Sequence, residues 1–317
     1  MTEIQGHRGA RALRPENTLP GLAYALAVGV DGLEFDVTLT SDGELILAHD
    51  LVVEAQTMSD TGPASAGDAE FPYVGKHWSQ LGLAQIQTLD AGHRRPPEPF
   101  ADTFEAVPGA GVPTLDQVCR LIVEAGADRV TLAVELKTDP AWPVAGVHAL
   151  TRGAIATLAD HGLTGRVRIL GFDWRVLEVA REEDPALPRV ALVEPRTWLP
   201  GSAWLAGLDS GQYPADPGGC ARAARDIGAQ WISPWDGMTS AGLITAAHRE
   251  GLRIAVWTVN DPGRMTELCD LGADAIVTDR PDVLRDVLAG RGEQVPVPCE
   301  LPWPDGIPAW APRVRAG

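Results

Sequence analysis

The chain has 317 residues, of which 26 are lysine or arginine and 43 are aspartate or glutamate, so its net charge is −17 with histidine neutral. Such an acidic chain repels polyanions, and no dense run of basic residues offsets the charge, so we expect no nucleic-acid partner. Hydrophobic residues make up 45% of the chain and charged residues 22%, which excludes disorder of the whole chain. Apolar runs such as residues 22–30 are about half as long as a membrane span, so no stable membrane insertion is expected.

The N-terminus and the cysteines indicate the compartment. Residues 1–7 contain no basic stretch followed by a long apolar run, so we predict no secretory signal peptide and expect a cytoplasmic location. The cysteines lie far apart and form no CxxC pair, which favours buried free thiols over disulfides or a structural metal. They are Cys119, Cys220, Cys269 and Cys299.

Short apolar runs alternate with helical patterns along most of the chain, which is typical of βα units and a mainly parallel sheet. The predicted strands are residues 4–7, 32–38, 45–48, 130–136, 167–171, 189–193, 230–233, 254–259 and 275–278. The predicted helices are residues 18–28, 115–125, 144–161, 174–183, 220–227, 240–250, 262–271 and 281–288. When 32–38 and 45–48 are counted as one bent hairpin, eight parallel strands remain.

Eight βα units of uniform composition predict a single α/β domain, a TIM-type (β/α)8 barrel, over residues 1–290. The competing fold is an open doubly wound sheet, which usually has a glycine-rich phosphate loop after its first strand, and Gly-His-Arg-Gly at 6–9 does not match that loop. Residues 53–112 are predicted to form a loop-rich insertion after the second βα region, lying over the barrel mouth. Residues 291–317 are predicted to form a proline-rich C-terminal tail that packs on the body.

Two histidines follow predicted strands. His7 and Arg8 end the first strand, and His49 follows the strand at 45–48. Ligands of parallel barrels bind at the carboxyl ends of the strands, where histidines can act as general base and general acid. The other histidines lie on predicted helices, at helix ends or in the insertion, so we expect them to be structural or peripheral: His77, His93, His148, His161 and His248.

Three carboxylates lie within the predicted strands. Glu34 and Asp36 share one strand face, and Glu135 shares a face with Lys137. Carboxylates on one inward face repel each other unless a cation lies between them, and oxygen ligands favour Ca²⁺, Mg²⁺ or Mn²⁺ over zinc. Two structural alternatives stay open, namely an exposed strand face for the first pair and a buried ion pair for the second. With Arg8 and Lys137, these groups indicate a metal-assisted acid/base site for an anion.

Several sequence blocks carry a family resemblance. They are Gly-His-Arg-Gly-Ala at 6–10, Pro-Glu-Asn-Thr at 15–18, Gly-Leu-Glu-Phe-Asp-Val at 32–37, Ala-His-Asp at 48–50, Val-Glu-Leu-Lys at 134–137, Val-Trp-Thr-Val-Asn at 256–260 and Ile-Val-Thr-Asp-Arg-Pro at 276–281. In order and spacing they resemble the glycerophosphodiester phosphodiesterases. The resemblance runs over residues 4–290 and leaves only the tail without a counterpart.

The resemblance implies a TIM-type barrel that hydrolyses glycerophosphodiesters to sn-glycerol 3-phosphate and an alcohol. By match to the family motifs it implies that His7 and His49 are the acid/base pair, that Glu34, Asp36 and Glu135 bind one Ca²⁺ or Mg²⁺ ion, and that Arg8 and Lys137 contact the phosphate. Trp257 is expected to pack on the glycerol backbone. We expect attack by the glycerol 2-hydroxyl to give a cyclic phosphate, and direct attack by water stays open.

Other interpretations remain at this stage. Phospholipase D toxins that act on sphingomyelin share the two histidines and the carboxylate cluster, but they are secreted and disulfide-bonded. A non-enzymatic phosphodiester-binding barrel would be expected to have lost a histidine or a carboxylate. A metal-dependent sugar-phosphate isomerase or aldolase would not explain His7 beside Arg8 together with His49. The alcohol is not predicted, because residues 93–97 and 172–236 depart from the family pattern.

Overall fold

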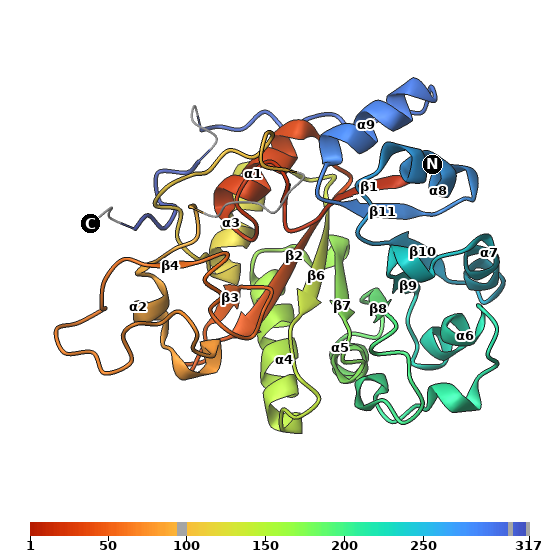
Figure 1. Cartoon of the computed structure of the whole chain (residues 1–317), viewed down its shortest axis with the longest axis horizontal. Coiled ribbons are helices and arrows are strands. Elements are labelled where there is room, and N and C mark those ends of the chain that lie inside the picture. The colour runs from red at the N-terminus through yellow and green to blue at the C-terminus, as the bar shows by residue number, and fades with distance from the viewer. Residues whose placement is uncertain (94–99, 304–306, 315–317) are drawn as a thin grey trace.

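The computed structural model describes residues 1–93, 100–303 and 307–314. Parallel strands close into a barrel, because β1 pairs with β2 on one side and with β11 on the other (Figure 1). The order around the barrel is β1 (Glu3–Gly6), β2 (Gly32–Leu39), β6 (Thr131–Leu136), β7 (Val167–Gly171), β8 (Arg189–Val193), β9 (Trp231–Pro234), β10 (Arg253–Val256) and β11 (Ala275–Thr278). The predicted eight-stranded parallel barrel is confirmed.

Helices connect successive strands and cover the outside of the barrel (Figure 1). They are α1 (Leu19–Val28), α3 (Leu115–Glu124), α4 (Val144–Asp160), α5 (Arg175–Glu183), α6 (Gly219–Asp226), α7 (Ala241–Arg249), α8 (Pro262–Asp270) and α9 (Pro281–Gly290). Local chemistry starts several of them. Thr114 accepts a hydrogen bond from the Gln117 backbone N–H at 3.3 Å, and the Gln117 side chain accepts one from the Thr114 N–H at 3.0 Å. Among the described helices, none is long and apolar enough to cross a membrane.

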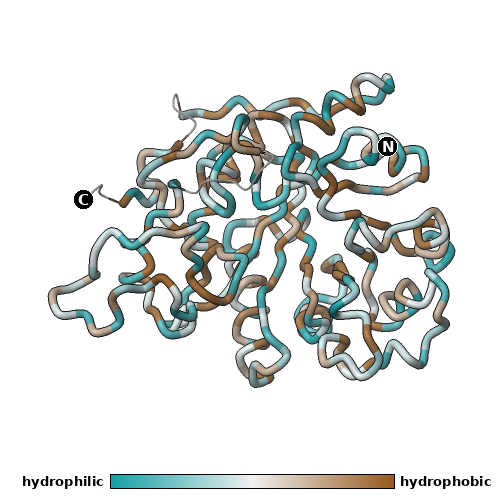
Figure 2. Tube along the Cα trace, viewed as in Figure 1, coloured by the Kyte–Doolittle hydropathy of each residue, from teal (hydrophilic) through white to brown (hydrophobic). Residues whose placement is uncertain are grey.

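Strand pleating separates two apolar layers from the polar site. Leu33, Phe35 and Val37 of β2 point outward into the layer between barrel and helices, and a second, smaller cluster fills the barrel interior. Figure 2 shows hydrophobic residues in brown along the strands and helices, interspersed with hydrophilic residues in teal. Because successive residues alternate, Glu34 and Asp36 face the barrel interior.

The segment after β2 forms a small unit beside the barrel. β3 (Leu45–Leu47) pairs antiparallel with β2, as the predicted hairpin requires. The insertion then contributes β4 (Ser59–Asp60), α2 (Leu83–Ile86) and β5 (Leu89–Asp90), with β4 and β5 paired antiparallel. It has its own apolar core around Tyr73, Trp78 and Ile86. The described part of the insertion holds only these short elements and one 3-10 turn between longer loops, which is compatible with the predicted loop-rich insertion.

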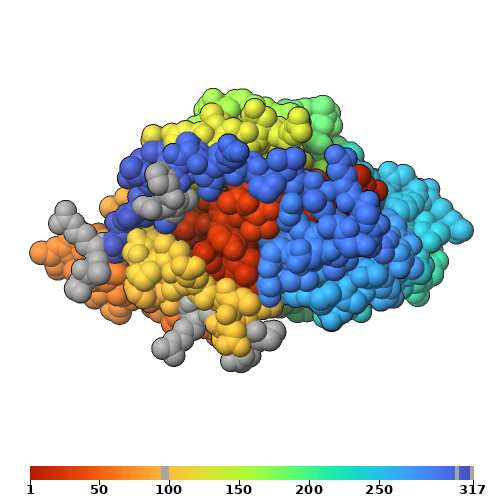
Figure 3. All heavy atoms as spheres, turned by 90° about the horizontal axis from the view of Figure 1, so that it is seen from above, coloured from red at the N-terminus to blue at the C-terminus, as the bar shows by residue number. Residues whose placement is uncertain are grey.

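The C-terminal segment packs on the body, as predicted. The Trp310 indole N–H donates to Glu124 at 2.9 Å, and the Arg120 guanidinium lies over the Trp310 ring, 4.2 Å from its centroid. In Figure 3 this segment, in blue, lies against the red N-terminal region and the yellow region that contains α3. The four cysteines are free thiols, as expected.

One strand boundary was wrong. Residues 254–259 were predicted as a strand, but β10 ends at Val256. Trp257 leaves the regular ladder: it pairs with Trp235 only through an isolated bridge, and its indole N–H donates to the Ser233 carbonyl at 2.9 Å. The indole therefore belongs to the barrel rim and not to the strand.

Candidate active site

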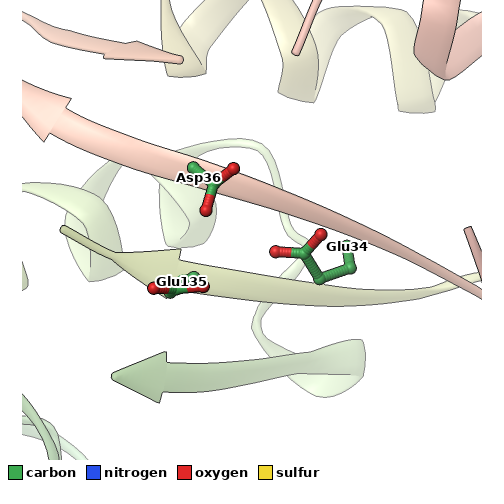
Figure 4. Close-up of side chains that lie close together, drawn as sticks. All are labelled: Glu34, Asp36 and Glu135. Carbon is green, nitrogen blue, oxygen red and sulfur yellow. The ribbon is translucent and has the colours of Figure 1, made fainter. Parts of the chain in front are cut away.

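The three predicted carboxylates meet inside the barrel. Glu34 and Asp36 of β2 and Glu135 of β6 point toward one another (Figure 4), and each offers an oxygen within 4.8 Å of the others. All three are buried, with Glu34 3%, Asp36 1% and Glu135 7% exposed. The alternative of an exposed strand face for Glu34 and Asp36 is therefore wrong. Three buried oxygen donors at this separation fit a hard divalent cation.

The charges around this cluster are uneven. Lys137 Nζ contacts Glu135 and lies 3.0 Å from Asp36 Oδ1, and Arg8 Nε lies 3.2 Å from Asp36 Oδ2. Burial alone raises the pKa of Asp36, but Lys137 and Arg8 bring it below its ordinary value. Burial, followed by repulsion from Asp36 and Glu135, raises the pKa of Glu34 well above its ordinary value. Asp36 thus has compensating cations while Glu34 is under-compensated, which a bound cation would correct.

His7 is held by a second carboxylate. Its Nδ1 lies 2.6 Å from Asp279 Oδ1, and Asp279 Oδ2 accepts hydrogen bonds from Asn260 Nδ2 at 2.9 Å and Arg11 Nη1 at 3.4 Å. Burial on its own raises the pKa of Asp279, but His7, Arg11 and Asn260 bring it well below the ordinary value, so the group is ionised. An ionised carboxylate only accepts, so Nδ1 carries the proton and Nε2 keeps its lone pair. Nε2 lies on the side of the carboxylate cluster, 4.0 Å from Glu34 Oε2.

His49 occupies a more open position. Its side chain is 33% exposed, against 13% for His7, and its Nδ1 lies 3.0 Å from Asp50 Oδ1. Burial and the nearby Lys137 lower the pKa of His49, with Asp36 opposing them. The two histidines thus have similar carboxylate partners and different access to solvent.

The loop after β1 positions the guanidinium of Arg8. Arg8 has a positive φ of 49° and its backbone N–H donates to Glu34 Oε2 at 2.9 Å, while its Nη1 donates to Glu16 Oε1 at 2.7 Å. Asn17 donates its side-chain amide to Asp36 Oδ2 at 2.8 Å and accepts from the Asp36 N–H at 3.2 Å. The Pro-Glu-Asn-Thr block therefore orients both a cation and a carboxylate of the site.

A cavity of about 260 Å³ joins these groups. Its charged lining includes His7, Arg8, Glu34, His49, Glu135 and Lys137, and the other lining residues are Leu170, Phe172, Leu192, Glu194, Arg196, Ser233, Trp235, Trp257 and Val277. Every predicted site residue except Asp36 lines it, and Asp36 lies directly behind in contact with Arg8 and Lys137.

The insertion and the remaining histidines contribute no described residue to the lining of this cavity. No described residue of 53–112 lines this cavity, although Thr57, Met58 and Trp78 of the insertion line a smaller hollow that shares His49. That the insertion lies over the barrel mouth stays a prediction. Residues 94–97 of the departing segment lie outside the described residues. Within the described chain, His77, His93, His148, His161 and His248 do not line the cavity, in agreement with their predicted peripheral positions.

Sequence reasoning assigned no role to four residues that support the site, namely Glu16, Asn17, Asn260 and Asp279. Each is a polar residue within a sequence block that carries the family resemblance, and this position was the one sign in the sequence that it supports the site. Their function is to hold other side chains, which spacing alone does not reveal.

Comparison with known proteins identifies this architecture. The model of the glycerophosphoryl diester phosphodiesterase family matches residues 7–283. The chain belongs to the glycerophosphoryl diester phosphodiesterase family. A glycerophosphodiester phosphodiesterase of Caldanaerobacter subterraneus subsp. tengcongensis is 25% identical over 296 residues, which cover 92% of this chain and 99% of the relative. A glycerophosphodiester phosphodiesterase of Bacillus subtilis is 26% identical over 294 residues, covering 90% and 85%.

Solved structures agree with the family assignment. A crystal structure from Silicibacter pomeroyi that carries this family's name matches with a TM-score of 0.80 at 27% identity, covering 93% of this chain and 95% of that one. An Oleispira antarctica phosphodiesterase, solved in complex with the product sn-glycerol-3-phosphate, shares the fold with a TM-score of 0.68 at 20% identity, covering 91% and 97%. The chain is therefore a phosphoric diester hydrolase of this family, and the isomerase, aldolase and non-enzymatic interpretations are set aside.

Proposed function

We propose that this phosphodiesterase hydrolyses glycerophosphodiesters to sn-glycerol 3-phosphate and an alcohol by a reaction that needs a divalent cation and two histidines. The observation that carries the proposal is the single cavity that joins His7 and His49 to a buried three-carboxylate cluster. The Oleispira antarctica phosphodiesterase, whose structure holds sn-glycerol-3-phosphate, supports the same product here. The chemistry is assigned to one domain, residues 1–290, and the tail 291–317 to its support.

The proposed metal ligands are Glu34, Asp36 and Glu135, which would hold one Ca²⁺ or Mg²⁺ ion, with Mn²⁺ also compatible with oxygen donors. When bound, such a cation neutralises charge on the phosphate and polarises its P–O bonds. Lys137, which contacts Glu135 and Asp36, is placed to balance this charge and to contact a non-bridging phosphate oxygen. Arg8 provides the second phosphate contact from the opposite loop.

The proposed general base is His7. Because Asp279 holds the proton on Nδ1, the Nε2 lone pair faces the cavity and can accept the proton of the glycerol 2-hydroxyl. Burial, followed by the charge of Arg8, lowers the pKa of His7, although Asp279 opposes both, and this keeps the ring neutral near pH 7. The hydroxyl oxygen then bonds to phosphorus, and the bond from phosphorus to the alcohol oxygen breaks.

The proposed general acid is His49 in its protonated form, which donates a proton to the departing alcohol oxygen. Burial and the nearby Lys137 lower the pKa of His49, so this protonated form is the minor one near pH 7. Its greater exposure lets it exchange protons with solvent. Water then adds to the cyclic phosphate with the roles exchanged: His49 takes the water proton, and His7 returns its proton to the glycerol 2-oxygen. Trp257 is proposed to pack on the glycerol carbons, since its indole is fixed by the Ser233 carbonyl at the cavity wall.

The test measures release of sn-glycerol 3-phosphate from glycerophosphocholine by metal-free enzyme resupplied with Ca²⁺, Mg²⁺ or Mn²⁺. His7→Ala and His49→Ala should each lower kcat by about 10²-fold or more with unchanged unfolding midpoints. His161→Ala is the matched control, because His161 bonds to Asp116 away from the cavity. Near-normal turnover of either site variant contradicts the two-histidine mechanism, and full activity in EDTA contradicts the cation requirement.

A further inference from the structure

One part of the cavity wall has a distinct composition. It is built from residues at the ends of β7 to β10, whereas the proposed chemistry lies on β1, β2, β3 and β6. This wall offers aromatic rings, one carboxylate and the guanidinium of Arg196, and none of these groups has a role in the proposed reaction except Trp257. The residues are Phe172, Leu192, Glu194, Arg196, Trp235 and Trp257.

Glu194 places a carboxylate at this wall. Its side chain is 15% exposed, and its Oε1 accepts hydrogen bonds from Arg196 Nη2 at 2.7 Å and Arg196 Nε at 3.0 Å. Its second oxygen has no hydrogen-bond partner among the residues that the structure describes. The Arg196 side chain is 84% exposed, so the pairing is screened by water and holds Glu194 only weakly. Glu194 can therefore accept a hydrogen bond from a ligand in the cavity.

The aromatic rings of this wall are held in place. Phe172 and Trp257 pack edge to face, with ring centroids 5.5 Å apart at 79°. Trp235 lies over Gly237, where a Cβ atom would approach the Trp235 ring to 2.2 Å, so only glycine leaves room for the indole. Trp235 is nevertheless 43% exposed, so its indole can form part of an open subsite. Fixed aromatic faces beside a carboxylate are the arrangement that binds organic ammonium groups.

We propose that this wall is the subsite for the leaving alcohol and that it favours an alcohol carrying an ammonium group, such as choline or ethanolamine. The inference rests on the proposed function, which places the glycerol hydroxyl and the phosphate at the carboxylate and histidine end of the cavity. The alcohol then extends toward β8 and β9. Glycerol and phosphate carry no positive charge, so the ammonium of the alcohol is the only cationic group of the substrate that can pair with Glu194.

The experiment compares kcat/KM for glycerophosphocholine, glycerophosphoethanolamine and glycerophosphoglycerol. Glu194→Gln should lower the ratio of the choline to the glycerol substrate about tenfold, the size of one ammonium contact. Trp235→Leu should lower the same ratio, with a smaller effect for ethanolamine because its ammonium has no methyl groups. Arg196→Gln frees Glu194 and should keep the ratio at the wild-type value or raise it. Glu183→Gln is the matched control, since Glu183 of the outer helix α5 is likewise a carboxylate paired with an arginine, Arg152 of α4.

The outcomes are distinguishable. A loss that is equal for all three substrates overturns the inference, because Glu194 would then contact the glycerophosphate part. An unchanged ratio in Glu194→Gln, or a fall in Arg196→Gln as large as in Glu194→Gln, also overturns it. If the wild-type enzyme hydrolyses none of the three substrates in the presence of a divalent cation, the proposed function itself fails. Unfolding midpoints of all variants separate a lost contact from a lost fold.

Discussion

The contact between Asp279 and His7 allows a sharp test through Asp279→Asn. The substitution keeps the size of the side chain and exchanges one oxygen for an NH₂ group. Asp279 Oδ2 accepts from both Asn260 and Arg11, so an amide oxygen is needed on that side. The NH₂ group of the variant therefore faces His7 Nδ1, which can then only accept. The proton moves to Nε2, and the base of the proposed reaction loses its lone pair.

The expected loss follows from this change of tautomer. General base catalysis contributes about 10²- to 10⁴-fold, and the equivalent Asp-to-Asn change in serine proteases, a worked case for another enzyme class, costs about 10⁴-fold in kcat. We therefore expect kcat to fall by about 10²- to 10⁴-fold. KM should change little, because Asp279 is 3% exposed and does not line the cavity.

The assay is steady-state release of sn-glycerol 3-phosphate, combined with ¹⁵N NMR of His7, which separates the Nδ1–H form of the wild type from the Nε2–H form of the variant. Asp173→Asn is the matched control, because Asp173 is also buried, at 1% exposure, but binds Arg175 and Thr138 instead of a histidine. Turnover of Asp279→Asn within threefold of Asp173→Asn, or an unchanged tautomer, would refute the reasoning.

Three further predictions concern the metal and the fold. Dialysis against EDTA should abolish turnover, and Ca²⁺ or Mg²⁺ should restore it; activity that survives chelation would leave the carboxylate cluster without its proposed role. Trp231→Ala should lower the free energy of unfolding in urea by about 3–5 kcal/mol, because the buried indole lies between the guanidinium groups of Arg168 and Arg253, at 4.1 and 4.3 Å. A cost below about 1 kcal/mol would contradict this. Gly9→Ala should cost at least about 2 kcal/mol in the same assay, since Gly9 has a φ of 91° and a Cβ would lie 2.7 Å from backbone atoms of α1. Gly43→Ala, also at positive φ but in open space, should cost less, and equal costs would refute the steric reason.

The barrel could be predicted because its signals are local. In β2, apolar residues alternate with Glu34 and Asp36, and this period of two follows directly from the pleat of a strand with one face toward the helices. The start of a helix could also be predicted from neighbouring residues. At α3, for example, the Thr114 hydroxyl accepts from the backbone N–H of Gln117, three positions later in the chain. The residue at which β10 ends could not be predicted from its neighbours in the sequence. It depends on the bridge between Trp235 and Trp257, which belong to different βα units.

The candidate site was predictable in its charged residues and not in its supports. Glu34, Asp36 and Glu135 stand out because carboxylates are rare in buried strands. The partner of His7 could not be read from spacing, since Asp279 lies 272 residues away and reaches it only because β11 closes the barrel against β1. Glu194 and Trp235 were not predicted as site residues for a related reason. They line the same cavity only because β8 and β9 pair and end at the same rim of the barrel.

The acidity of the chain can be reconciled with an anionic substrate by counting charges at the cavity. Glu34, Asp36 and Glu135 face Arg8 and Lys137, which leaves about one negative charge when all five are ionised. A phosphodiester of charge −1 is repelled by that site, whereas a divalent cation turns its sign positive. The raised pKa of Glu34 shows the same imbalance, because the third carboxylate has too little positive charge near it. On this count the proposed cation would bind before the substrate, and it would offset the net charge of −17 at the one place where the substrate binds.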